Sequence, residues 1–465
     1  MAGQKLSALI ESVDFAKTHR RVWLLSSMGI MLDGFDFFIM GVAIPLIAHE
    51  WNLTPWETGL ASSAAIVGAI VGAAVMGPVS DRIGRKLAFR IDLAMFVVFA
   101  LLSALAPSLW WLVAFRFLLG VGIGADYPIS SSYVSEIAPS RLRTRLLVAT
   151  FSFQAVGQIL GVLVGLAILT LEPTPDAWRW MLGAGVVPAI VIVWLRRGVP
   201  ESPQWLAATN QLKEAAAAMS VFCERLVTVE EIRDEEVAGA LTTVHKADLR
   251  DLFSKRYRKS TLLTSVPWFL MDIATYGVGV FTPTILAAIA LSPSASTQFI
   301  ADDITSTEGA ALLDLFLVFG FATALLTIAR LGAVVLQSAG FFVMAGGLLV
   351  LAIATTLTDG SPLNLALVLI GFAAFNFFMN AGPNATTFLM PTEAFPAEIR
   401  GSGSGIAAAS GKVGAAVGTL FFPILTSAIG LSTTLVIIAA GCAVAAVLTI
   451  TLRSAVKPRV PAMLV

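Results

Sequence analysis

The polar stretch at residues 77–86 reads GPVSDRIGRK and lies where two long apolar stretches, near 58–80 and 87–106, meet. Within it, Gly84 permits a tight backbone turn because glycine has no Cβ. Asp81 can pair with the neighbouring bases or with a helix N-terminus. A short charged turn between two apolar runs is typical of consecutive helices that cross a membrane in opposite directions.

The composition of the whole chain agrees with this interpretation. Of the 465 residues, 57% are hydrophobic and 13% charged, and the mean hydropathy is +0.85. A soluble protein needs more charge to cover its surface, whereas a membrane-spanning helix needs about 20 mostly apolar residues. The formal net charge of zero gives no indication of nucleic acid as a partner. Twelve apolar stretches lie near 22–48, 58–80, 87–106, 110–133, 146–170, 179–195, 261–290, 309–329, 333–357, 362–390, 402–429 and 431–452.

The basic residues predict the orientation of these spans. With the N-terminus inside, every Lys and Arg except Arg116, Arg179 and Lys412 falls on the inner side, and the outer loops carry acids. An excess of Lys and Arg marks cytoplasmic loops. We therefore expect an all-α, multi-pass protein of the cell inner membrane, with twelve spans and both termini in the cytoplasm.

The two halves of the chain repeat a short motif. EIAPSRLR (136–143) follows the fourth span, and EAFPAEIR (393–400) follows the tenth, with the same spacing from Glu to Pro and to Arg. Duplicated halves are typical of secondary carriers, which bind substrate near the midplane between the repeats. The predicted domains are a six-helix bundle (1–197), a cytoplasmic linker with short helices (198–258) and a second six-helix bundle (259–465).

Charged residues at the predicted inner helix ends indicate a conformational latch. Exposed ion pairs there are expected to contribute only about 1 kcal/mol. The loop at 328–333 of the second half, IARLGA, lacks the acid and two of the bases, so the latch is expected on one side only. Its predicted members are Asp81, Arg82, Arg85, Glu136, Arg143, Glu393 and Arg400.

Ionisable residues within spans are costly in a bilayer and mark functional candidates. Asp272 lies between Trp268 and Tyr276 at helical spacing, so the three share one face. Structural ion pairing is the alternative, and it is an equally good interpretation for Arg116. Asp92 and Asp314 lie near span ends and are expected to reach interfacial water. The further candidates are Asp33, Asp36, Asp126 and Lys412, with the polar residues Tyr127, Gln154 and Asn384.

The sequence indicates neither a cofactor nor an enzyme. GVGIGA (120–125) is similar to a dinucleotide loop, but no strand precedes it. Small residues there instead allow close helix packing. We find no nucleophile–base pair and no metal-ligand spacing, and therefore expect neither catalysis, nor a metal, nor a cofactor.

Several motifs resemble known families. The turn at 77–86 resembles the signature loop of the major facilitator superfamily, and PESPQWL (200–206) resembles a motif of sugar porters. Four further segments resemble spans four, seven, ten and eleven of the phosphate:proton symporter family. They are GIGADYPIS (122–130), WFLMDIATYG (268–277), NAGPNATTF (380–388) and GIAAASGKVGA (405–415).

The resemblance implies a major facilitator fold of two pseudo-symmetric six-helix bundles and a proton-coupled symporter of inorganic phosphate. It implies alternating access, with phosphate and protons as ligands, the lipid bilayer as surroundings and a monomer as the working form. The implied substrate shell is Tyr127, Gln154, Trp268, Asp272, Tyr276, Asn384 and Lys412. The residues implied in proton coupling are Asp33, Asp36, Asp126, Asp272 and Arg116.

The chemistry of these residues agrees with an anion site. Tyr, Trp and Asn donors with one Lys can surround a small oxyanion. An ionised Asp272 would repel an anion, whereas a protonated one would donate to it, so the residue can couple the two ligands. A proton-coupled porter of a sugar, organic acid or other metabolite remains an alternative, and a substrate-sensing receptor is a further one.

Overall fold

The computed structural model describes residues 4–12, 15, 17–232, 249–290, 299–357 and 361–456. These residues form helices, short turns and no strand. They belong to two compact units, Met1–Val244 and His245–Val465. The boundary between the units falls inside the predicted linker at 198–258, so the short helices that begin this linker belong to the first unit.

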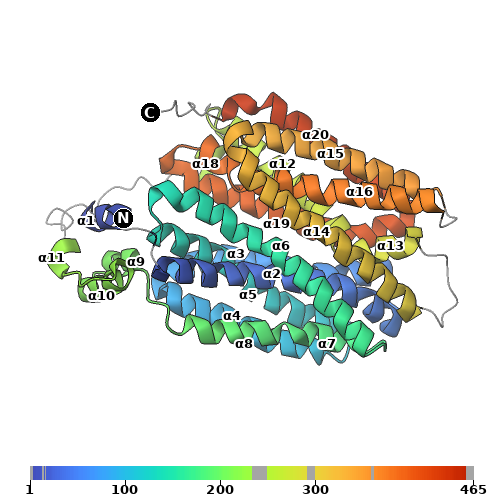
Figure 1. Cartoon of the computed structure of the whole chain (residues 1–465), viewed down its shortest axis with the longest axis horizontal. Helices are drawn as coiled ribbons and strands as arrows, with labels where there is room; N and C mark the ends of the chain where they lie inside the picture. Colours follow the sequence, from blue (N-terminus) through green and yellow to red (C-terminus); the bar gives the residue numbers. More distant parts are fainter. Residues whose placement is uncertain are drawn as a thin grey trace. The chain divides into compact units, whose positions relative to one another are not determined.

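The first unit contains six helical spans in its described residues. Figure 1 labels the helices that form them. The last span is made of two shorter helices, which meet at Gly185. The six spans are α2 (Lys17–Trp51), α3 (Pro55–Ile83), α4 (Arg85–Ala104), α5 (Leu109–Ile137), α6 (Ser140–Leu171) and α7 (Ala177–Ala184) with α8 (Val186–Arg196).

Four short helices gather at one end of this unit (Figure 1): α1 (Gln4–Ser12), α9 (Pro203–Ala208), α10 (Leu212–Cys223) and α11 (Val229–Ile232). Leu6 and Ile10 of α1 pack with Leu206 and Met219 in a small apolar core. Short helices α9, α10 and α11 therefore follow the sixth span. The core gives the N-terminal helix a fixed place against them.

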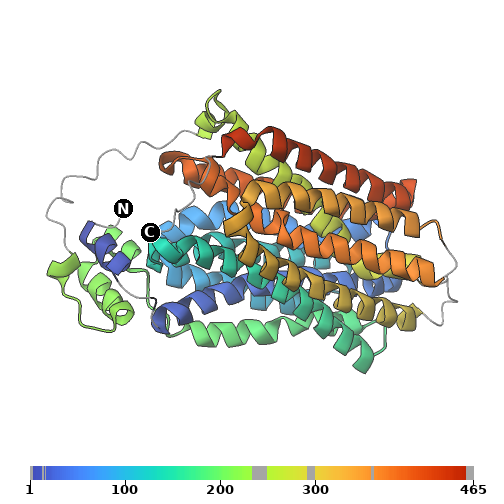
Figure 2. The same ribbon diagram turned by 45° about the horizontal axis from the view of Figure 1, so that its top comes forward.

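The second unit contains the remaining spans (Figure 2). The chain bends by 57° between Arg258–Gly279 and Thr282–Ile289, so its first span is broken. Short helices η2 (Leu249–Phe253) and η4 (Arg453–Ala455) flank the spans. The α-helices of this unit are α12 (Arg258–Gly279), α13 (Thr282–Ala290), α14 (Phe299–Leu331), α15 (Ala333–Ala354), α16 (Pro362–Ala381), α17 (Pro383–Thr387), α18 (Met390–Ala394), α19 (Ala397–Ile429) and α20 (Leu431–Thr451).

Within the described ranges, 11 helices are long and apolar enough to cross a membrane, and 12 when the bent pair α12–α13 counts as one. Many large apolar side chains face outward, as a surface in contact with lipid requires; Leu326 is 76% exposed. The prediction of an all-α membrane protein with twelve spans is therefore confirmed.

Glycines set the closest helix contacts and the tightest turns. A Cβ on Gly124 of α5 would lie 2.0 Å from the Ala69 carbonyl oxygen of α3, a distance that no side chain tolerates. The small residues of 120–125 thus allow close packing, as predicted. Gly84 turns the chain between α3 and α4 with φ +91°, and Gly332 does so between α14 and α15 with φ +78°. These conformations favour glycine, so the loops at 77–86 and 328–333 turn in a similar way.

Candidate functional site

A buried ion pair joins α2 to α5 in the first unit. Arg116 Nη1 donates to Asp36 Oδ1 at 2.7 Å, and both side chains are almost fully buried. Asp33 lies one turn earlier on α2 and is buried as well. Arg116 Nε and Nη2 have no hydrogen-bond partner among the described residues.

A second buried ion pair lies between α5 and α8. Arg196 Nη1 lies 3.3 Å from Asp126 Oδ1, and Ser130 donates to the other carboxylate oxygen at 3.1 Å. Arg196 also donates to the Leu25 carbonyl oxygen at 2.8 and 3.0 Å.

The resemblance implies Arg116 as a partner for Asp33, Asp36 and Asp126. Of these, Arg116 pairs with Asp36. Asp126 lies ten residues further along the same helix, about 15 Å away, and pairs with Arg196 instead.

Sequence reasoning missed Arg196 and misplaced two acids. Arg196 precedes Arg197 at a helix end, where its sequence context indicates only an inner flank. Asp92 and Asp314 were expected to reach water, yet both are 3% exposed. Asp92 lies against the Asp126 carboxylate. For Asp314 the cause is the helix start: α14 begins at Phe299, ten residues before the predicted span, so Asp314 lies deep within it.

The two predicted substrate residues of the first unit lie on neighbouring helices. The Tyr127 ring of α5 stacks near Phe151 of α6, with centroids 6.1 Å apart. Gln154 lies one turn further along α6 and is buried. A Cβ on Gly34 would lie 2.1 Å from the Gln154 carbonyl oxygen, so α2 and α6 approach at this level.

The second unit brings four predicted residues into one cluster. Trp268, Asp272 and Tyr276 lie on one face of α12 and are buried, as their spacing predicts. The Trp268 indole and the Lys412 ammonium both interact with the Asp272 carboxylate. Lys412 Nζ lies 5.6 Å from the centroid of the Tyr276 ring. One carboxylate, one ammonium and two aromatic donors thus meet inside this unit.

Asn384 joins this cluster indirectly. It lies on α17 and donates through Nδ2 to Asn380 Oδ1 at 2.7 Å. Phe388, just beyond α17, packs edge-on against Trp268 with centroids 4.7 Å apart. Asn384 is therefore placed by polar contacts along its own segment, and that segment contacts α12 through an aromatic pair.

The predicted latch residues of the first unit surround Arg85. Its guanidinium lies 2.7 Å from Asp81 Oδ1 and 2.6 Å from Glu136 Oε1. Glu201 accepts from the backbone N–H groups of Arg85 and Lys86 at 2.9 and 3.0 Å, which caps α4. Of the two partners predicted for Asp81, a base and a helix N-terminus, the structure shows the base. The N-terminus of α4 is capped by Glu201 from the PESPQWL motif instead.

The burial of this cluster differs from the expected exposed pairs. The side chain of Asp81 is 67% exposed, but those of Arg85 and Glu136 are 7% and 15% exposed. Glu136 is consequently the more important of the two acids, because it compensates a buried guanidinium. The reason is the packing of α5 beside α4, which the sequence does not reveal.

The other predicted latch residues make weaker or undescribed contacts. Arg143 lies 3.7 Å from Glu11 of α1 and donates to the Ala138 carbonyl oxygen at 3.1 Å. Arg82 is exposed, and Glu393 is half-buried on α18. The side chain of Arg400 lies outside the described residues. In the part of the chain that the structure describes, no group of three His, Cys, Asp or Glu side chains could hold a metal ion.

Comparison with known proteins places the chain in a family. Residues 22–454 match the model of the family described as "Sugar (and other) transporter". The chain belongs to this family of membrane transporters. Its relatives include inorganic phosphate transporter 1-2 of Oryza sativa subsp. japonica, 30% identical over 91% of this chain and 87% of the relative. The inner membrane metabolite transport protein YgcS of Escherichia coli (strain K12) is also 30% identical, over 92% of this chain and 90% of its own.

Solved structures show the fold. The xylose transporter XylE from E. coli, in a partially occluded inward-open conformation, matches with a TM-score of 0.75 at 21% identity, over 94% of this chain and 98% of its own. A second structure of XylE, described as a major facilitator superfamily proton:xylose symporter, matches with a TM-score of 0.69 over 93% and 95%. The chain therefore has the predicted major facilitator fold.

Proposed function

We propose that the protein is a proton-coupled symporter of inorganic phosphate that works by alternating access in the cell inner membrane, with both termini in the cytoplasm. The observation that carries this proposal is the buried cluster of Trp268, Asp272, Tyr276 and Lys412 in the second unit. It combines donors for an oxyanion with a single carboxylate.

The cluster suits a ligand that binds together with a proton. Lys412 and the polar atoms of Trp268 and Tyr276 donate, which favours an anion with several acceptor oxygens. Asp272 repels such an anion when ionised and donates to it when protonated. In this scheme, proton binding at Asp272 precedes or accompanies substrate binding, and loss of the proton promotes release.

The buried pairs of the first unit support a role in proton movement. Asp33, Asp36 and Asp126 lie within spans, where an ionised carboxylate requires a nearby cation. Arg116 supplies this cation to Asp36, and Arg196 supplies it to Asp126. Protonation of an acid would weaken its pair and free the arginine, so the pairs can respond to the proton gradient. The phosphate transporters among the relatives, at about 30% identity, support the same substrate.

A proton-coupled porter of a sugar, organic acid or other metabolite is the second candidate. The relative YgcS is described as a metabolite transport protein, and the structural match XylE as a proton:xylose symporter. Asn384 and Asn380 also supply amides that both accept and donate, as a sugar site requires. A substrate-sensing receptor would bind the same ligands without accumulating them.

Uptake into sealed proteoliposomes tests the proposal. We expect saturable phosphate uptake that an inward proton gradient stimulates and arsenate inhibits. Asp272→Asn is expected to abolish accumulation, while Asp251→Asn, the same change at an exposed position of η2, leaves it unchanged. Proton-dependent uptake of a neutral sugar without phosphate transport would establish the second candidate instead. Binding of phosphate with no uptake would indicate a receptor.

Orientation can be tested separately. A reporter domain that is active only in the cytoplasm is fused to each terminus in turn. We expect both fusions to be active. Activity of a reporter that requires the opposite compartment would reverse the proposed topology.

A further inference from the structure

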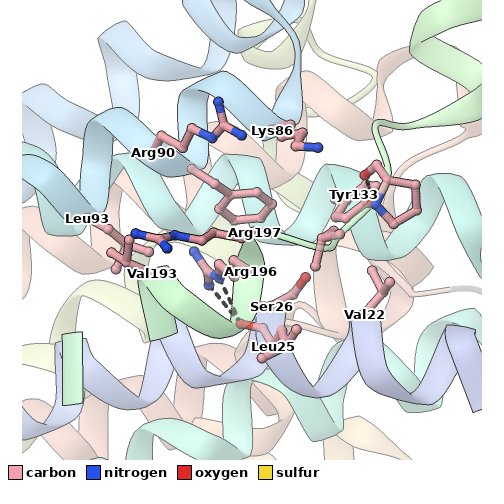
Figure 3. A pocket seen from close by; sticks show the side chains of 13 residues that line it. Val22, Leu25, Ser26, Lys86, Arg90, Leu93, Tyr133, Val193, Arg196 and Arg197 are labelled. Carbon is pink, nitrogen blue, oxygen red and sulfur yellow. Dashed lines mark hydrogen bonds between the residues drawn. The ribbon is translucent and has the colours of Figure 1, made fainter. Parts of the chain in front are cut away.

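A cavity of about 460 Å³ opens in the first unit between the start of α4 and the end of α8. Its volume lies within the range of roughly 300–1,000 Å³ of small-molecule sites. Figure 3 shows Lys86 and Arg90 from α4 on one side, and Arg196 and Arg197 from the end of α8 on the other. These four residues are the charged part of its lining, which contains no acid.

One of these cations is already compensated, and three are not. Arg196 contacts Asp126, donates to the Leu25 carbonyl oxygen (Figure 3) and lies 4.2 Å over the Phe89 ring. Lys86, Arg90 and Arg197 have no carboxylate partner among the residues that the structure describes. Three uncompensated cations around one cavity favour an anion as ligand. A guanidinium group can bind two oxygens of one phosphate at the same time.

The rest of the cavity wall is largely apolar. Val22, Leu25, Phe89, Leu93 and Val193 line it. A free inorganic anion would leave these side chains against water. An amphiphile with an anionic head would cover them.

The outer faces of both flanking helices are apolar as well. On α4, Leu87 is 46% exposed, and on α8, Trp194 is 64% exposed. Such faces lie against lipid in a membrane-spanning unit, and Trp is enriched at the membrane–water interface. The two helices that flank the cavity therefore also present apolar faces to lipid.

We propose that this cavity binds the phosphate headgroup of an anionic phospholipid. Lys86, Arg90 and Arg197 hold the phosphate, and the apolar wall takes the start of the acyl chains. The positions of the bases at the predicted cytoplasmic ends of their helices agree with basic pockets that bind such headgroups there. The chemistry shared with free phosphate is the oxyanion, and the apolar wall favours the lipid.

The test uses the full-length protein, purified in a neutral detergent and stripped of lipid. Binding of phosphatidylglycerol, phosphatidylcholine and inorganic phosphate is measured by native mass spectrometry and thermal shift. The variant is Arg90→Gln with Arg197→Gln, both exposed, so folding should persist; size-exclusion elution and the lipid-free Tm check this. The control is Arg145→Gln with Lys213→Gln, which changes the same charge at exposed positions outside the cavity.

We expect phosphatidylglycerol to bind more tightly than phosphatidylcholine. The paired substitution should weaken phosphatidylglycerol binding about 25-fold, since each cation near a lipid headgroup contributes about fivefold. The control pair of substitutions lies outside the cavity and should change the affinity for phosphatidylglycerol by no more than about twofold.

Three results would overturn the proposal. Equal affinity for the two lipids would remove the need for an anionic head. Displacement of phosphatidylglycerol by inorganic phosphate at similar concentration would assign the cavity to a free ion. An equal loss in the control pair would show a diffuse surface effect.

Discussion

The charges of Asp36 and Arg116 should be strongly coupled in the stability of the first unit, so that loss of either one alone is costly. The perturbation is a cycle of three variants: Asp36→Asn, Arg116→Gln and the two together. Asn and Gln keep the approximate size of the side chains and remove their charges. The cycle therefore isolates the interaction between the two charges from the loss of packing.

The burial of the pair sets the magnitude. Side-chain exposures are 1% for Arg116 and 4% for Asp36, so water screens neither charge. Removing one partner of such a pair leaves a buried, uncompensated ion and costs about 3–5 kcal/mol. Replacing both partners is often close to neutral. We expect each single variant to lose stability by this amount and the double variant to recover most of it.

Unfolding of the purified protein in detergent, by heat and by titration with sodium dodecyl sulfate, measures these changes. The exposed pair between Arg225 and Glu231, at 2.8 Å, provides a control with similar geometry. Its side chains are 51% and 37% exposed. The corresponding cycle with Arg225→Gln and Glu231→Gln should show no resolvable coupling, since exposed pairs are weak.

Additive losses in the Asp36 and Arg116 variants would refute this reasoning. They would show that the two charges do not compensate one another, despite their distance. Uptake measured on the same variants adds a second distinction. If Asp36 serves proton coupling, Asp36→Asn should impair uptake driven by a proton gradient more than exchange of substrate.

Three further predictions follow from other contacts. Lys412→Ala and Tyr276→Phe should each weaken phosphate binding by about 1–3 kcal/mol, because each removes a hydrogen-bond donor. Isothermal titration measures this change. An unchanged Kd in both variants would exclude the cluster from the substrate site. Glu136→Gln should destabilise the protein by about 3 kcal/mol, and Asp81→Asn by less than about 1 kcal/mol. Glu136→Gln should also shift more of the protein toward the inward-open state than Asp81→Asn does, as measured by cysteine labelling in a cysteine-free background. Equal effects of the two variants would contradict the difference in burial. Gly124→Leu should prevent a stable fold, because its side chain meets backbone, and normal yield and Tm would show that α3 and α5 can separate.

The sequence predicts the features that depend on local pattern. Span positions follow from the length of apolar runs, and the shared face of Trp268, Asp272 and Tyr276 follows from helical spacing. The tight turn at Gly84 follows from the conformational freedom of glycine. Each of these depends on residues close together in the chain.

The partners of charged side chains are less predictable, because they depend on which helices pack together. Arg196 has the sequence context of an inner flank, yet it is buried against Asp126 from another helix. Glu201 caps α4, although more than a hundred residues of sequence separate the two. Its motif, PESPQWL, resembles a motif of sugar porters but does not reveal this partner. Asp314 is buried because α14 begins ten residues before the apolar run. The first residues of this helix are polar, so the apolar run does not reveal the length of the helix.

The apolar core that α1 shares with α10 has a consequence for synthesis. Leu6 leaves the ribosome more than 200 residues before its partner Met219. At roughly 5–20 residues per second, this interval lasts about 10–40 s. Throughout it, the six spans of the first unit enter the membrane while the N-terminal helix lacks its binding surface. A nascent chain halted before residue 215 should therefore show an α1 that proteases can cut, and the same helix should become resistant once α10 has emerged.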